Sequence, residues 1–212
     1  MRRVLVMVVG LSLFASAIDF DFTVDPPVAK GEVPMIKLDD NIKIGGTKER
    51  TALHFDADTK PITVPGTGKL TLDNGLTIAL VFFPADKGDG KNWHMLVLKK
   101  NEYLLDRAGD TIHFKWKTGK KWLTVFQHRV KMDKPRRLVV VINKERKLSL
   151  WCDGKHYVSA QLLTEGAEQP NSGNEEIMLG GGWTGGNFVG DLYRIKVIGE
   201  AIPWAKVAEV LK

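Results

Sequence analysis

The sequence has a single cysteine, Cys152, so it cannot form an internal disulfide. A secreted domain without disulfides must be held together by its hydrophobic core, and a chain of 212 residues is long enough to bury one. Cys152 follows Trp151 within an apolar strand pattern, which predicts a buried, unreactive thiol. A catalytic thiol would need a neighbouring histidine or other cation to lower its pKa, and sequence alone cannot display one.

A hydrophobic run long enough to span a bilayer is also missing from the N-terminus. The apolar run from Val4 to Phe14 is shorter than the roughly 20 residues that a transmembrane helix needs. Arg2 and Arg3 precede it and Ala15-Ser16-Ala17 follows it, the pattern of a secretory signal at residues 1–17. The mature chain of 195 residues (212 − 17) then begins at Ile18, is secreted or periplasmic, and has no stable membrane insertion after cleavage. The alternative is a buried N-terminal strand or helix.

Positive charge is only mildly in excess. The net charge of the whole sequence is +6, and it falls to +4 when the two leading arginines are removed. The basic residues between Lys87 and Lys155 are interspersed with apolar ones, which predicts the solvated face of a sheet. The functional alternative is a surface that attracts anionic polysaccharide or an anionic cell envelope. No recognition helix is present, so nucleic acid is not an expected partner. The composition, 43% hydrophobic and 26% charged, excludes a disordered or collagen-like chain.

Catalytic and metal motifs are missing as well. Glycoside hydrolases need two carboxylates about 5–10 Å apart, and a Glu-x-Asp-x-Glu strand that would supply them does not occur. The nearest substitutes are Asp19 with Asp21 and Glu102 with Asp106. The five histidines form neither an HExxH motif nor a cluster with cysteine, and no phosphate-binding or dinucleotide motif is present.

Short alternating segments rich in β-branched and aromatic residues are abundant, and they predict an all-β fold. The predicted strands are Leu76–Phe83, His94–Leu98, Thr111–Lys117, Trp122–Val130, Arg137–Ile142 and Lys147–Ala160. Polar turns are predicted at Thr118-Gly119-Lys120, at Asn143–Arg146 and at Asp153-Gly154. Many short strands with turns every 8–12 residues predict an antiparallel β-sandwich.

The two ends of the chain differ from this pattern. After Pro203, the residues Val207, Val210 and Leu211 fall on one helical face, which predicts a short C-terminal helix. The segment from Ile18 to Lys48 is richer in Pro, Asp and Lys and is expected to wrap the edge of the sandwich. No linker or repeat divides the chain, so residues 18–212 are predicted to form a single domain.

Three segments in order resemble a laminin-G-like domain of the concanavalin A-like lectin and glucanase superfamily. They are the opening Ala52–Pro84, the hairpin Pro135–Tyr157 and the closing Glu175–Val210, so the resemblance covers residues 52–210. It implies a β-sandwich of jelly-roll topology. It also implies a non-catalytic module that binds glycan or an extracellular or envelope protein.

The sequence departs from that family at two positions. Pro135-Arg136-Arg137 replaces the usual Trp-His-His, and Tyr193-Arg194 replaces the paired acids of the closing motif. Some relatives bind calcium at the rim of the sandwich through carboxylates and backbone carbonyls. Asp56 and Asp191 are the candidate calcium ligands that remain, and turn-capping or solvated carboxylates are the alternative. No other cofactor is expected.

Aromatic residues supply the candidate ligand contacts. A glycine-rich segment, Gly180–Gly186, is predicted to form a loop at the rim of the sandwich, where a sugar ring could stack on tryptophan while an amide holds its hydroxyls. Trp151 and Trp204 fit core positions. The candidate ligand-binding residues are Trp183 and Asn187, with Trp93 and Trp122 as additions.

Two alternatives to a binding module remain open. A glycan-active enzyme of the same fold, a hydrolase or a lyase, would need a catalytic cluster, and His113, His128 and Arg129 could form one. A purely structural interaction domain would instead present an exposed apolar patch and no groove.

Overall fold

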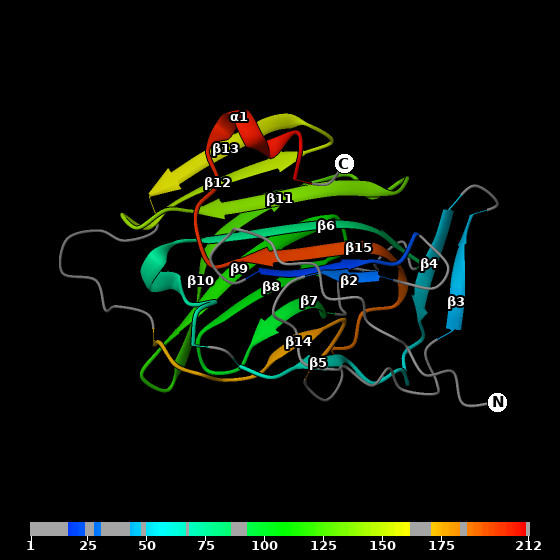
Figure 1. The fold of residues 1–212 in the computed structure, drawn as a ribbon, viewed down its shortest axis with the longest axis horizontal. Coiled ribbons are helices and arrows are strands. Elements are labelled where there is room, and N and C mark those ends of the chain that lie inside the picture. The colour runs from blue at the N-terminus through cyan, green and yellow to red at the C-terminus, as the bar shows by residue number, and fades with distance from the viewer. Residues whose placement is uncertain are drawn as a thin grey trace.

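The computed structural model describes residues 17–23, 28–30, 43–47, 50–66, 68–85, 93–161, 171–182 and 186–210. Within these residues the chain forms two antiparallel sheets, one of nine strands and one of six, packed as a β-sandwich (Figure 1). The predicted all-β sandwich with a short C-terminal helix is therefore confirmed. Both helical elements are short: a 3-10 turn η1 (Leu72–Asn74) and the helix α1 (Trp204–Val207).

The nine-stranded sheet is built around the last strand of the chain. Its main path runs β13-β12-β11-β6-β15-β1-β2, and β4 joins it by pairing with both β15 and β3. Its strands are β1 (Ala17–Asp21), β2 (Val28–Lys30), β3 (Lys43–Thr47), β4 (Arg50–Phe55), β6 (Leu76–Pro84), β11 (Arg136–Ile142), β12 (Lys147–Cys152), β13 (Lys155–Gln161) and β15 (Gly190–Ile198).

The six-stranded sheet has the order β10-β9-β8-β7-β14-β5. Its strands are β5 (Ile62–Val64), β7 (Trp93–Lys99), β8 (Tyr103–Ala108), β9 (Thr111–Thr118), β10 (Lys121–Arg129) and β14 (Ile177–Leu179). Four of the six form a consecutive meander from β7 to β10, so short turns fix their register. The strand β8 lies where the sequence analysis predicted none.

The main core lies between the two sheets and follows the two-residue period of the strands. Along β9, for example, Ile112, Phe114 and Trp116 are buried in this core. Near the start of β15, Phe188 packs against Phe55 and Phe82. Phe188 thus anchors the start of the last strand in the core.

The predicted hairpin turns connect the strands as expected. Asp153 and Gly154 join β12 to β13 with φ of 51° and 81°, the left-handed conformations that a two-residue hairpin turn requires. Gly119, at φ 53°, lies in the turn from β9 to β10. Cys152, just before the first of these turns, is 1% exposed, and burial raises the pKa of its thiol to about 11. The predicted buried, unreactive thiol is consistent with this environment.

The N-terminal segment enters the sheet. The strand β1 pairs with β15, and Ile18, Phe20 and Phe22 are each buried in the core. Of the predicted signal, only Ala17 lies within the described residues. The segment Ile18–Lys48 thus contributes strands at one side of the sheet, in place of the predicted wrapping of its edge.

The C-terminal helix covers part of the outer face of the nine-stranded sheet. Val207 is buried there in a cluster with Trp151. The ring of Trp204 meets that of Trp151 edge-on at 5.3 Å. Trp204 is nevertheless 62% exposed, so its predicted core position is wrong, because the helix turns this side chain outward over the sheet.

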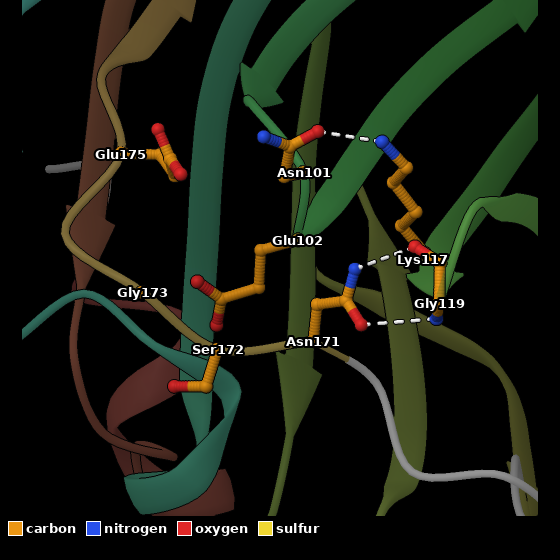
Figure 2. Close-up of a pocket in the computed structure, with 8 residues that line it drawn as sticks. All are labelled: Asn101, Glu102, Lys117, Gly119, Asn171, Ser172, Gly173 and Glu175. Atoms are coloured by element: carbon orange, nitrogen blue, oxygen red, sulfur yellow. Dashed lines mark hydrogen bonds between the residues drawn. The ribbon is translucent and has the colours of Figure 1, made fainter.

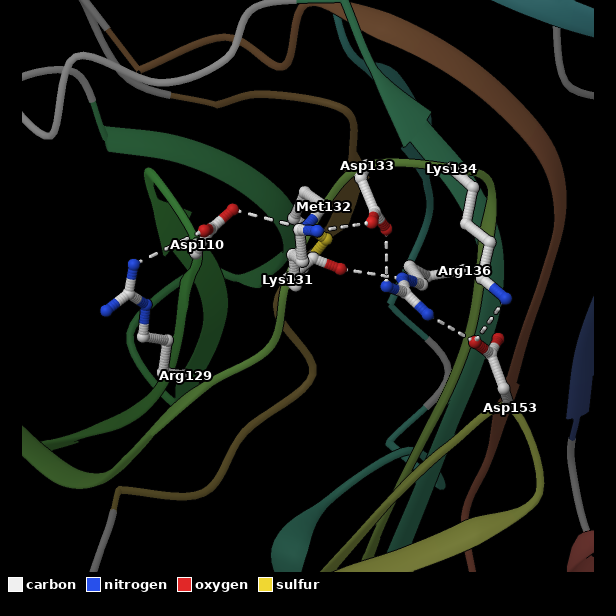
Figure 3. Close-up of polar contacts among 8 residues, drawn as sticks. All are labelled: Asp110, Arg129, Lys131, Met132, Asp133, Lys134, Arg136 and Asp153. Carbon is white, nitrogen blue, oxygen red and sulfur yellow. Dashed lines mark hydrogen bonds and ion pairs between the residues drawn. The ribbon is translucent and has the colours of Figure 1, made fainter.

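A network of charged residues ties the two sheets together where β10 leads into β11 (Figure 3). The Arg136 guanidinium donates to Asp133 and to Asp153, each at 2.6 Å. Burial alone would raise the pKa of Asp153, but the Arg137 backbone N–H and the Arg136 guanidinium outweigh it and lower that pKa. Arg136 stands where the laminin-G-like pattern has a histidine, and here it acts as the centre of an ion-pair network.

Candidate functional site

The outer face of the six-stranded sheet carries the residues that are most suited to binding. Because Ile112, Phe114 and Trp116 of β9 point into the core, the alternate residues His113, Lys115 and Lys117 project from the opposite side. Trp93 from β7 and Trp122 from β10 flank them. We call Trp93, His113, Lys115, Lys117 and Trp122 the aromatic–lysine face.

Trp93 forms one end of this face and is 45% exposed. The Lys115 ammonium lies 3.6 Å from the centre of its indole ring, within the range of a cation–π contact. The His113 ring lies beside it, 4.8 Å away between ring centres. These contacts fix the orientation of the indole, and its exposure leaves ring surface available to a ligand.

A buried carboxylate supports Trp93 from below. Asp106 of β8 is 1% exposed, lies 2.6 Å from the Lys115 ammonium and is 3.0 Å from His113 Nδ1. An ionised carboxylate is costly to bury unless it is paired and hydrogen-bonded, and these two partners meet that need. Asp106 therefore positions Lys115 and His113, and through them Trp93.

Trp122 forms the other end of the face. The Lys117 ammonium lies 6.0 Å from its ring centre and donates a hydrogen bond to Asn101 Oδ1 at 2.6 Å. Because Asn101 is neutral, this contact does not neutralise the positive charge of Lys117. Trp122 also packs against a small apolar cluster on the same face, made of Met95, Leu98, Leu104 and Met178.

The glycine-rich segment crosses this cluster. A Cβ at Gly182 would lie 2.7 Å from Leu98 Cδ2 and 2.8 Å from Met178 Sδ, so only glycine fits there without displacing a neighbour. Trp183 lies outside the described residues. Its predicted ligand contact therefore stays a prediction, although the residue before it lies over the outer face of the sheet.

Asn187 holds this segment in place. Its side-chain amide donates to the carbonyls of Ala57 and Thr59, at 3.0 and 3.2 Å. Its own backbone carbonyl lies 2.9 Å from His94 Nδ1. The amide that the sequence analysis assigned to ligand hydroxyls is engaged with the backbone, so in this structure Asn187 is a positioning residue.

The two candidate calcium ligands contact the same imidazole. His54 Nδ1 lies 2.7 Å from Asp191 Oδ1, and His54 Nε2 lies 3.1 Å from Asp56 Oδ1. Since they bond different ring nitrogens, the carboxylates lie on opposite edges of the ring. Within the described residues, no group of three or more His, Cys, Asp or Glu is arranged to hold a metal ion. Calcium binding stays a prediction.

The catalytic clusters that the sequence left open do not assemble. His128 pairs with Ile112 of β9 and meets the ring of Tyr157 edge-on. Because Ile112 and His113 are consecutive in the strand and point to opposite faces, His128 faces away from His113. Glu102 and Asp106 are also separated: Glu102 pairs with Lys99 in the interior, at 2.5 Å, and accepts from the Leu72 N–H. Burial raises the pKa of Glu102 despite the Lys99 ammonium.

Sequence reasoning found both tryptophans of the aromatic–lysine face, named His113 only for a possible catalytic cluster, and missed Lys115 and Lys117. The alternation of His113, Lys115 and Lys117 with buried aromatics is visible in the sequence and assigns them to one face. Their proximity to Trp93 depends on a strand two positions away in the sheet, which the sequence pattern does not display.

Comparison with known proteins shows the fold alone. No family model and no curated protein matches the chain. Among solved structures, the binding domain of botulinum neurotoxin DC in complex with rat synaptotagmin II has a TM-score of 0.69 and 7% identity, over 91% of this chain and 50% of that one. The serotype G binding domain has a TM-score of 0.70 and 8% identity, with 91% and 50% covered.

A third solved structure is that of botulinum neurotoxin type C, whose cell entry depends upon interaction with two ganglioside molecules. It has a TM-score of 0.61 and 8% identity, and the match covers 92% of this chain and 50% of that one. The chain thus spans about half the length of these structures, with which it shares a β-sandwich fold. Among the described residues, no helix has the length and apolar character needed to cross a membrane.

Proposed function

We propose that this chain is an exported, non-catalytic, laminin-G-like module that binds glycan through its aromatic–lysine face. The observation that carries the proposal is the arrangement of Trp93 and Trp122 around a row of lysines on one sheet face. Exposed indole rings offer apolar surface to a sugar ring, and neighbouring ammonium groups donate hydrogen bonds to its oxygens.

The charge of the face favours an acidic glycan. Lys115 is neutralised by Asp106, whereas Lys117 donates to the neutral Asn101 amide and has no ion pair among the described residues, so it retains its attraction for an anion. The botulinum structures that share the fold add support of a general kind, because one is a complex with synaptotagmin II and cell entry of another neurotoxin depends upon two ganglioside molecules. Those chains are about twice as long, so the assignment here depends on the residues of the face.

Removing an indole tests the proposal. We expect the protein to bind at least one acidic polysaccharide in isothermal titration, and Trp93→Ala and Trp122→Ala each to weaken that binding at least tenfold, about 1.4 kcal/mol. Trp204→Ala is the matched control, because Trp204 is exposed on the opposite sheet. Equal losses in all three variants, or no binding to neutral or acidic glycans, would contradict the proposal and favour a structural interaction domain.

A further inference from the structure

A polar cavity of about 450 Å³ lies at the end of the six-stranded sheet, beside the aromatic–lysine face (Figure 2). Three segments enclose it: the turn between β7 and β8, the turn between β9 and β10, and the residues that lead into β14. It is lined by Asn101, Glu102, Lys117, Gly119, Asn171, Ser172, Gly173 and Glu175.

Hydrogen bonds fix the walls of this cavity. Asn171 and Gly119 are joined by two reciprocal bonds of 3.0 Å, one from the Gly119 N–H to Asn171 Oδ1 and one from Asn171 Nδ2 to the Gly119 carbonyl. The Asn171 N–H also donates to the Lys117 carbonyl at 2.7 Å. On the far side, Ser172 Oγ donates to Asp73 Oδ2 at 2.7 Å. A cavity held in this way needs little ordering when a ligand binds.

The interior of the cavity mixes donors with acceptors. Figure 2 shows the side chains of Asn101, Glu102 and Glu175 directed into one space. Asn101 Oδ1 accepts from Lys117, so its Nδ2 group remains as a donor, and the Lys117 ammonium has three N–H groups of which Asn101 takes one. The Glu175 carboxylate is an acceptor when ionised, whereas the Glu102 carboxylate is already engaged by Lys99 and the Leu72 N–H.

This chemistry selects one class of ligand. Every lining residue is polar or glycine, so the cavity has no wall for an apolar molecule. A metal ion lacks ligands, because Glu102 is already paired with Lys99 and accepts from Leu72. Hydroxyl groups both donate and accept, so a hydroxyl-rich ring can satisfy Asn101, Lys117 and Glu175 together.

We propose that the cavity is a separate binding site for a single sugar ring. It deepens the proposed function by adding a site of the same ligand class, and it shares only Lys117 with the aromatic–lysine face. The volume lies within the range of small-ligand sites and accommodates one monosaccharide. The Lys117 ammonium, which lines the cavity, lies 6.0 Å from the ring centre of Trp122, so the cavity adjoins the face at this lysine.

Nuclear magnetic resonance of the full chain tests the site directly. The probes are glucose, N-acetylglucosamine and glucuronic acid, each titrated to about 50 mM, well above the Kd of about 1 mM expected for so small a ligand. We expect at least one of them to shift the side-chain amides of Asn101 and Asn171 and the backbone amide of Gly119 along one saturating curve. No shift of these signals with any of the three sugars would overturn the proposal.

Variants separate this site from the face. Glu175→Ala should weaken the sugar-induced shifts at least fivefold, whereas Glu209→Ala, on the exposed C-terminal turn, should leave them unchanged. Trp93→Ala should also leave them unchanged. Shifts that survive Glu175→Ala and disappear in Trp93→Ala would overturn the cavity site while supporting the face. Saturating shifts in a protein that binds no polysaccharide would support the cavity and overturn the proposed function of the face.

Discussion

At the scale of the residue, Asp153 combines a structural and an electrostatic role. It adopts a left-handed conformation in the hairpin turn, where Asp and Asn are tolerated. Its carboxylate accepts from the Arg137 N–H at 3.0 Å and pairs with Arg136 at 2.6 Å. Because these contacts favour the ionised form, the pKa of Asp153 in the folded protein is below its usual value.

Asp153→Asn should reduce the acid sensitivity of the fold. A carboxyl whose pKa is lower in the folded state stabilises the protein above its unfolded pKa, and that stability is lost as the pH falls through the folded pKa. The wild type should therefore lose about 1 kcal/mol more than the variant between about pH 5 and about pH 2. Urea unfolding across this range measures the difference. Asp58→Asn, in an exposed turn, is the control, and parallel curves for wild type and Asp153→Asn would refute the prediction.

Some residues of the candidate site could be predicted from the sequence, and others could not. Trp93 and Trp122 were found because large aromatics within polar strands are conspicuous. The role of Asp106 could not be found, because its partners His113 and Lys115 lie on another strand and reach Trp93 on a third. Trp204 was wrongly predicted to lie in the core, because the sequence of the short helix does not show which of its sides faces the sheet.

At the scale of the element, a glycine at a strand end and a glycine in a turn differ in whether they tolerate an added side chain. Gly190, at φ 139°, begins β15 in close contact with β6, and a Cβ there would lie 2.3 Å from the Phe83 carbonyl oxygen and 2.7 Å from the Ala85 nitrogen. Gly119, at φ 53°, has open space where its Cβ would be. Only the first of these positions requires glycine for packing as well as for conformation.

Gly190→Ala should therefore destabilise the protein far more than Gly119→Ala. The first change forces β15 away from β6 and should cost about 4 kcal/mol or more, in the range of severe core defects. The second should cost about 1 kcal/mol, the penalty of a left-handed conformation for alanine. Denaturant unfolding of both variants gives the comparison. A similar cost for the two would show that β15 can shift to accommodate the added methyl group.

Apolar runs rich in β-branched and aromatic residues were predicted well as strands, and several shorter or more polar strands were not. Six predicted strand segments correspond to β6, β7, β9, β10, β11 and the β12–β13 hairpin, with ends that differ by a few residues. The strand β8 was missed because it is short, has no β-branched residue and carries the charged Asp106 and Arg107 directly after its two leucines. The strand β1 was missed because its short run of alternating Asp and apolar residues comes soon after the apolar run Val4–Phe14.

At the scale of the whole molecule, the first described strand contributes to the core shared by both sheets. A chain that starts at Ile18 retains the buried residues Ile18, Phe20 and Phe22, whereas a chain that starts at Thr23 loses all three. Since each such side chain contributes about 2 kcal/mol, the shorter chain should lose about 6 kcal/mol or fail to fold. Thermal and urea unfolding of the two chains measure this loss, and equal stabilities would contradict it.

The position of β15 also has a consequence for how the protein is made. Along one side it pairs with β6, and along the other it pairs first with β4, over Gly190–Leu192, and then with β1, over Arg194–Ile198. Three earlier strands thus share one partner that leaves the ribosome after all of them. Until β15 emerges, the edge of each strand that will face it has no native neighbour. The nascent chain therefore depends on slow, long-range closure of the sheet and is exposed to aggregation in the meantime.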